Sequence, residues 1–132
     1  MKKILASTAL IAGLLGSGTA FAQTVTTICP LTSGSTAAGP GAVPASGTAG
    51  THYMTRAIAP KCSANTNVSG VDGTAGAWYA VGANSIKGKT NFGGHTNGGA
   101  VAKTVDCAIP GGCTVGESQT ARGVANTAAG GT

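Results

Sequence analysis

The side chains of this sequence that could take part in chemistry are few and are spread along the whole chain. They comprise four cysteines, two histidines and three acidic residues. Cysteines can form disulfides or, together with histidines, bind a metal ion. A histidine beside a serine and an acid can support nucleophilic catalysis, and two carboxylates can hydrolyse a glycosidic bond. The spacing of these residues decides which of these chemistries the sequence favours.

The cysteines favour disulfides over a metal site. Their number is even, and they stand at positions Cys29, Cys62, Cys107 and Cys113. No two of them have the Cys-x-x-Cys spacing typical of zinc sites, and the two histidines are remote from them in sequence. We therefore predict a disulfide scaffold, with no metal ion and no cofactor.

Two pairings of the cysteines stay open. We favour Cys107–Cys113, which closes a Pro-Gly-Gly turn, together with Cys29–Cys62, which ties the N-terminal segment to the main block. On the chain-entropy argument these two loops would stabilise the fold by about 2 and about 4 kcal/mol. The alternative joins Cys62 to Cys107 and Cys29 to Cys113, and it would clamp the two ends of the central block.

Catalytic sets can be drawn from the histidines and acids, but no motif supports them. Ser85, His95 and Asp106 would supply a nucleophile, a base and an acid, yet their spacing matches no nucleophile turn. Paired carboxylates could come only from Asp72, Asp106 and Glu117, and none of these lies in a supporting motif. We therefore predict that the protein is not an enzyme. The alternative is a small secreted hydrolase or inhibitor that uses the loop around His95.

Three residues are candidates for ligand binding. His95 and Asn97 lie in a glycine-flanked loop, and binding residues are often carried on such loops. Trp78 and Tyr79 are neighbours in a predicted strand, so their side chains face opposite sides of it. We expect the larger Trp78 to be the buried anchor and Tyr79 to lie outside, where its ring could bind a surface glycan.

The stretch from Gly82 to Thr90 superficially matches a phosphate-binding loop. The spacing between Gly82 and Gly88 is one residue too long for that motif. The residues after Thr90 also cannot begin the helix whose N-terminus would hold the phosphate. The stretch is more typical of a glycine turn between two strands.

The elements that must position these residues are predicted to be short strands. After Ala22 the sequence has a single leucine, Leu31, and a single glutamate, Glu117, so it lacks residues from which helices are usually built. It is rich in Thr, Val, Ala, Gly, Ser and Asn, a mixture typical of strands joined by turns. We predict a mostly β fold, a small antiparallel sandwich or barrel of short strands stapled by disulfides.

Composition divides the chain into consecutive segments. Residues 1–22 have the charged start, apolar stretch and Ala-Phe-Ala cleavage site of a signal peptide. Residues 23–31 alternate like a strand, and residues 32–50 are a low-complexity stretch predicted to be a flexible linker. Residues 51–113 are predicted to form the β core, and residues 114–132 a flexible tail. The protein is therefore expected to be periplasmic or secreted, with no membrane span.

Two stretches of the predicted core have strand patterns that place particular side chains. The segment from His52 to Ile58 is predicted to be a strand that ends at Pro60. The segment from Val101 to Ile109 has the clearest alternation of apolar and polar residues. That alternation predicts that Val101 and Val105 face the same side of the sheet.

Charge and composition narrow the classes of function. The six basic residues and three acids after Ala22 give a formal charge of about +3, without the clustered Lys/Arg typical of a nucleic-acid surface. We predict an exported protein of the bacterial cell envelope or exterior that acts as a binding or structural component. Its partners would be other envelope proteins, surface glycans or further copies of itself. The composition resembles that of secreted bacterial pilin-like and spore-coat-like subunits, so the alternative is a pilin-like or coat-like surface fibre subunit.

Overall fold

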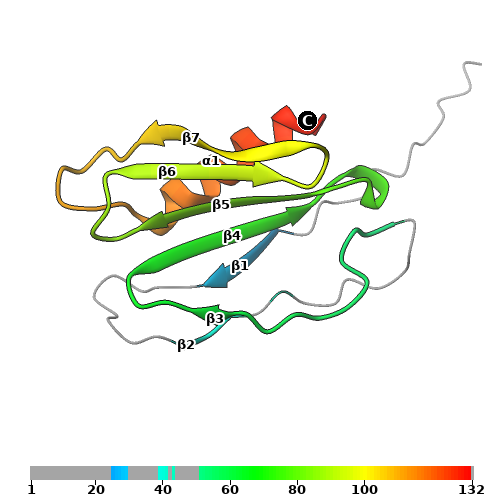
Figure 1. Ribbon diagram of the computed structural model, residues 1–132, viewed down its shortest axis with the longest axis horizontal. Coiled ribbons are helices and arrows are strands. Elements are labelled where there is room, and N and C mark those ends of the chain that lie inside the picture. Colours follow the sequence, from blue (N-terminus) through cyan, green and yellow to red (C-terminus); the bar gives the residue numbers. More distant parts are fainter. Residues whose placement is uncertain (1–24, 30–38, 42, 44–50, 132) are drawn as a thin grey trace, which may run out of the picture.

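The computed structural model of the protein describes residues 25–29, 39–41, 43 and 51–131. The predicted signal peptide, residues 1–22, lies outside the described residues, as does most of the predicted linker, residues 32–50. The described residues form a large antiparallel sheet with a helix packed against one of its faces (Figure 1). Within these ranges, no helix is both long enough and apolar enough to cross a membrane.

The large sheet has five strands in the order β1-β4-β5-β6-β7. Their bounds are Val25–Cys29 for β1, Thr66–Asp72 for β4, Tyr79–Ser85 for β5, Thr90–His95 for β6 and Gly99–Asp106 for β7. Strands β4 to β7 follow one another in the chain as antiparallel neighbours, whereas β1 comes from the N-terminal side and pairs with β4 (Figure 1). The predicted mostly β fold is therefore confirmed.

Both disulfides form with the favoured pairing. Cys29 is joined to Cys62 with a Cα–Cα distance of 5.7 Å, and Cys107 to Cys113 with a Cα–Cα distance of 5.2 Å. The first links β1 to β3 (Lys61–Cys62), and the second links the end of β7 to the residue before the N-cap of the helix. The alternative pairing is excluded, and the predicted scaffold is confirmed.

The chain after Cys113 is not the loose tail that its composition predicts. It forms the helix α1, Val115–Ala128, which lies across the sheet (Figure 1). A capping box starts the helix: Thr114 Oγ1 accepts a hydrogen bond from the Glu117 N–H at 3.3 Å, and Glu117 Oε2 accepts one from the Thr114 N–H at 2.6 Å. The prediction failed because helix stability in proteins comes mainly from packing against the rest of the fold, which propensity does not report.

The helix packs closely because small residues meet on both sides of the interface. Ala121 and Ala125 of α1 are buried against the sheet. On the sheet, a Cβ added to Gly82 would collide with the backbone of α1, and one added to Gly93 would lie 2.8 Å from the Ala121 carbonyl oxygen. These glycines therefore set the distance between α1 and the sheet. The side of the sheet that α1 covers is called the helix face.

Trp78 is the one large aromatic residue of the helix face within the described chain. It is 7 % exposed and packs in a cluster with Val71, Ala80 and Ala125. Its indole N–H donates a hydrogen bond to Asn126 Oδ1 at 3.0 Å, so its polar atom is satisfied within the core. The prediction that Trp78 is a buried anchor is confirmed.

Three buried asparagines form a ladder across the helix face, one from each of β4, β5 and β6. Asn67 Nδ2 donates to Asn84 Oδ1 at 2.8 Å, and Asn84 Nδ2 donates to Asn91 Oδ1 at 2.6 Å. The Asn84 amide also donates to the Thr114 carbonyl at 2.8 Å, which ties the start of α1 to the sheet. Burial of the Asn84 and Asn91 amides is tolerated because each bonds to a neighbouring amide and to backbone, whereas Asn67 Oδ1 has no hydrogen-bond partner among the described residues.

The opposite face of the sheet is covered only in part. β2 (Gly39–Pro40) pairs with β3, and Val43 forms an isolated bridge with Ile58. With Cys62, this segment packs on Ile28 and Tyr79 in an apolar cluster, and we call this region the covered half. The predicted strand from His52 to Ile58 does not form, since within the described part of the chain its only strand pairing is that bridge.

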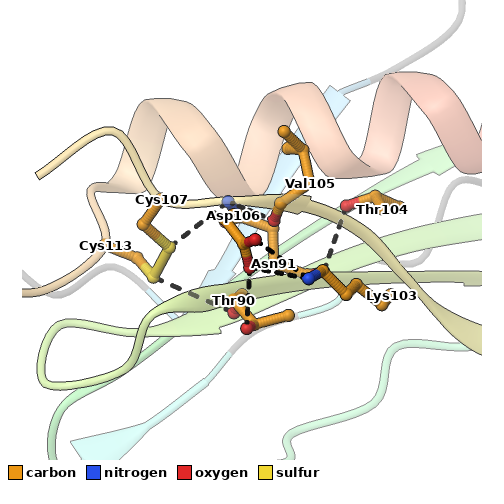
Figure 2. A network of polar contacts seen from close by, with 8 residues as sticks. All are labelled: Thr90, Asn91, Lys103, Thr104, Val105, Asp106, Cys107 and Cys113. Carbon is orange, nitrogen blue, oxygen red and sulfur yellow. Dashed lines mark hydrogen bonds and ion pairs between the residues drawn. A yellow bond between two sulfur atoms is a disulfide. The ribbon is translucent and has the colours of Figure 1, made fainter. Parts of the chain in front are cut away.

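A bulge in β7 changes which side chains share a face. The pairing of β7 with β6 shifts by one residue at Thr104. Because the extra residue reverses the alternation, Lys103 and Asp106 lie on the same side and form an ion pair. The prediction that Val101 and Val105 share a face is wrong for the same reason: Val101 lies on the opposite face, and Val105 points toward α1 (Figure 2).

Candidate functional site

Tyr79, expected at the surface, is buried. Its side chain is 8 % exposed and lies against Gly70 within the covered half. Burial, with the nearby charge of Asp72, raises the pKa of Tyr79 to about 12. The expectation of an exposed ring is wrong because the disulfide-linked segment around Cys62 covers this side of the sheet, while α1 covers the other.

The other two predicted binding residues contact the protein itself. His95 ends β6 on the helix face, paired with Ala80, and its ring packs over Gly99. It is half-buried, and its Nδ1 has no hydrogen-bond partner among the described residues. The exposed Asn97 donates from Nδ2 to the Ala129 carbonyl at 3.1 Å. These contacts hold the β6–β7 turn against the end of α1.

The predicted site residues are not brought together into one cluster. Tyr79 and His95 belong to neighbouring strands, but their side chains lie on opposite faces of the sheet. Ser85 and His95 are far apart as well. His95 pairs with Ala80, five positions from Ser85, and that separation spans about 17 Å along a strand.

Each of the three acids is bound to other groups of the protein. Asp72 Oδ1 accepts hydrogen bonds from the backbone N–H groups of residues 53–54, at 2.9 and 3.1 Å. Asp106 forms its ion pair with Lys103 at 2.9 Å. Glu117 belongs to the capping box of α1. All three carboxylates therefore stabilise local structure.

The opposite face carries a pocket of about 460 Å³ beyond the covered half. It is lined by Thr66, Ala83, Asn84, Ser85, Gly88, Lys89, Thr90 and Phe92. Phe92 pairs with Ala83 across β5 and β6, and its side chain is 45 % exposed. The volume lies within the range of small-molecule sites, roughly 300–1,000 Å³. We call this region, between the β5–β6 turn and Phe92, the open pocket.

The turn between β5 and β6 forms the rim of the open pocket. The Gly88 N–H donates to the Ser85 carbonyl at 2.8 Å, and the Lys87 N–H donates to Ser85 Oγ at 3.3 Å. Ser85 thus accepts both of the bonds that close the turn. The sequence prediction of a glycine turn in this stretch matches the observed geometry.

The Cys107–Cys113 disulfide anchors the same rim. The Cys113 N–H donates to the Ser85 carbonyl at 3.2 Å, and the Cys107 N–H donates to the Lys89 carbonyl at 2.9 Å. The two bonded cysteines therefore hold both ends of the turn. The Cys107–Cys113 disulfide, which the sequence analysis predicted as a stabilising bond, therefore also fixes the shape of the open pocket.

Polar contacts join β6 to β7 next to the open pocket (Figure 2). Asn91 Nδ2 donates to the Val105 carbonyl at 3.3 Å on the helix face. On the other face, Thr90 Oγ1 donates to Asp106 Oδ1 at 3.2 Å, next to the ion pair of Asp106 with Lys103. The hydrogen bonds from Lys103 and Thr90 lower the pKa of Asp106, so it stays charged and neutralises Lys103.

Sequence reasoning missed Phe92 and the open pocket. The sequence does contain one signal, a single large apolar residue followed by two glycines. Glycines have no side chains to pack against the ring, so this pattern favours an exposed phenylalanine. Exposure of that ring depends on where the segment around Val43 and Cys62 stops covering the sheet. No local pattern shows that limit.

Fold and site together define a small, disulfide-stapled antiparallel sheet with a helix on one face and a pocket on the other. No protein family matches the sequence, and no match was found among curated proteins or among solved structures. In the part of the chain that the structure describes, no group of three or more His, Cys, Asp or Glu side chains is placed to hold a metal ion.

Proposed function

We propose that this is an exported protein of the cell envelope or exterior that binds a small ligand in the open pocket. The observation that carries the proposal is Phe92, a large apolar side chain left 45 % exposed in the wall of a cavity of about 460 Å³. Concave sites with apolar walls and a few polar groups are typical of ligand binding.

The architecture of the pocket supports binding by a preformed site. Phe92 and Ala83 lie on paired central strands, and the Cys107–Cys113 disulfide anchors the rim through two backbone hydrogen bonds. A ligand entering such a site has little backbone to order, so less of its interaction energy is lost to conformational entropy.

Export is supported by two independent features. Residues 1–22 have the pattern of a signal peptide. All four cysteines form disulfides, which persist in oxidising compartments such as the periplasm or the exterior.

The test uses the neutral apolar dye N-phenylnaphthylamine, whose fluorescence rises on transfer from water to an apolar site. The wild type should bind the dye saturably, and Phe92→Ala should weaken binding about three- to tenfold. Complete burial of a phenylalanine is worth roughly 1.5–3 kcal/mol, the dye can cover only the exposed part of this ring, and 1.4 kcal/mol is tenfold.

Val101→Ala is the matched control. Val101 is 72 % exposed and lies on the same side of the sheet, outside the open pocket. It should bind the dye as the wild type does. Absence of saturable binding in the wild type, or equal weakening in both variants, would show that the open pocket is not a site.

A further inference from the structure

We infer that the ligand of the open pocket is an amphipathic organic anion, with an apolar or aromatic body and one acidic group. This inference rests on the proposed function, since it names the ligand class for the same pocket. The body would pack on Phe92 and Ala83, and the acidic group would pair with Lys89.

Lys89 is an unneutralised cation at the rim. Its side chain is exposed, it lines the open pocket, and among the described residues it forms no ion pair. Lys103, on the same face in β7, is already neutralised by Asp106 at 2.9 Å. The pocket therefore combines an apolar wall with one available positive charge.

No acidic side chain of the protein is available to Lys89. The sequence contains three acids in all. Asp72 ends β4 opposite Tyr79, at the other end of the sheet, and is bonded to backbone there. Asp106 belongs to Lys103, and Glu117 caps the helix. An anion that pairs with Lys89 must therefore come from outside these side chains.

Ser85 offers a second group for the same anion. Its Oγ accepts a hydrogen bond from the Lys87 N–H at 3.3 Å, which leaves the hydroxyl proton to donate. Ser85 and Lys89 both line the open pocket and stand at the two ends of the turn. An acidic group at the rim could thus accept from a hydroxyl and an ammonium together.

The test compares two dyes that share one apolar body. N-phenylnaphthylamine is neutral, and anilinonaphthalene sulfonate adds a single negative charge. The sulfonate should bind the wild type more tightly than the neutral dye, and added salt should weaken only the sulfonate. Both dyes should bind more weakly to Phe92→Ala.

Lys89→Gln should weaken binding of the sulfonate about two- to fivefold, the range of exposed ion pairs, and leave the neutral dye unchanged. Lys87→Gln is the matched control, because Lys87 is exposed in the same turn and does not line the pocket. It removes the same net charge, and it should leave both dyes unchanged. Thermal melts of both variants check that the fold is intact.

The outcomes separate this inference from the proposed function. If the neutral dye does not bind, or binds independently of Phe92, the proposed function is wrong. If the neutral dye binds through Phe92 but Lys89→Gln leaves the sulfonate unchanged, the pocket stands and the anion inference is overturned. Equal effects of Lys87→Gln and Lys89→Gln would also overturn it, because they indicate a general positive field.

Discussion

The helix face and the opposite face of the same sheet differ in the size and polarity of their side chains. On the helix face the central positions are occupied by Gly82, Gly93 and the asparagine ladder around Asn84. On the opposite face stand larger apolar side chains such as Tyr79 and Phe92. The helix covers the first face completely at its centre, whereas the second is covered around Tyr79 and open around Phe92.

The two faces are therefore stabilised in different ways. On the helix face, close backbone approach and the hydrogen bond from the Asn84 amide to the Thr114 carbonyl hold α1 in one position. On the opposite face, apolar burial holds the covered half, and the apolar surface around Phe92 stays exposed. Changes on the helix face should therefore affect folding, and changes in the open pocket should affect binding.

The largest effect is expected from adjacent substitutions on the two faces. Gly82→Val places a side chain where a Cβ already collides with the α1 backbone, so it should cost more than about 3 kcal/mol and prevent accumulation of folded protein. Ala83→Val projects into the open pocket and should fold normally while reducing dye binding. Circular dichroism and secretion yield compare the folding of the two variants, and the dye fluorescence of Ala83→Val measures its binding. Equal yields of the two variants would show that the helix does not pack on Gly82.

The two aromatic residues provide the next comparison. Trp78→Ala removes a buried ring and its hydrogen bond to Asn126, and it should cost about 3–5 kcal/mol. Phe92→Ala removes a ring that is 45 % exposed and should cost less than about 1 kcal/mol. Denaturant unfolding gives both values. A normal unfolding midpoint for Trp78→Ala would place the indole outside the core.

A smaller effect is expected at the asparagine ladder. Asn84→Ala leaves Asn67, Asn91 and the Thr114 carbonyl without their shared partner, and it should destabilise the fold by about 1–3 kcal/mol. Asn97→Ala is the control, because Asn97 is exposed and its side chain donates one hydrogen bond, to the Ala129 carbonyl. Thermal melting compares them. A ladder variant as stable as the control would mean that the amides do not hold the helix face together.

The smallest effect is a pH dependence at the start of α1. Hydrogen bonds from the Ala108 and Thr114 N–H groups lower the pKa of Glu117 below its ordinary value of 4.5. A carboxylate whose pKa is lowered by folding stabilises the fold above its unfolded pKa, and that contribution is lost as the pH falls through the folded pKa. The melting temperature should therefore decrease as the pH is lowered below about 4.5, and this decrease should be less steep in Glu117→Gln. Identical acid profiles would contradict the capping role of Glu117. The pKa of Asp106 is lowered as well, so Asp106 contributes to the same loss of stability in acid. The effect of Glu117 is therefore the difference between the acid profiles of the wild type and Glu117→Gln.

Part of the fold and of the site follows from local sequence. An even set of cysteines predicted a disulfide scaffold and favoured the pairing that forms, with a second pairing left open. A composition of β-branched and small residues with few leucines predicted a mostly β fold. Trp78 was correctly predicted to be buried because so large a side chain has few places in a small domain. These properties depend on residue type and on near neighbours in the chain.

The sequence does contain a local signal for the helix, but the prediction of a flexible tail was based on composition and did not use it. Thr114 and Glu117 have the spacing of a capping box, and Ala121 and Ala125 continue it at helical spacing. An alanine stripe becomes a packing surface only against a sheet that has glycine at the facing positions, such as Gly93. That match joins residues about thirty positions apart, and no window of neighbouring residues contains it.

Residue types and their spacing were enough to predict a disulfide scaffold, a strand-rich fold and a buried tryptophan. The three-dimensional fold was needed to choose between the two cysteine pairings, and to show that Tyr79 is buried, that Phe92 is exposed and that the Cys107–Cys113 disulfide anchors the rim of a pocket. These features depend on which distant segments of the chain meet and cover a face of the sheet. Tyr79 is covered by the segment that the Cys29–Cys62 disulfide holds against the sheet, and this segment does not cover Phe92.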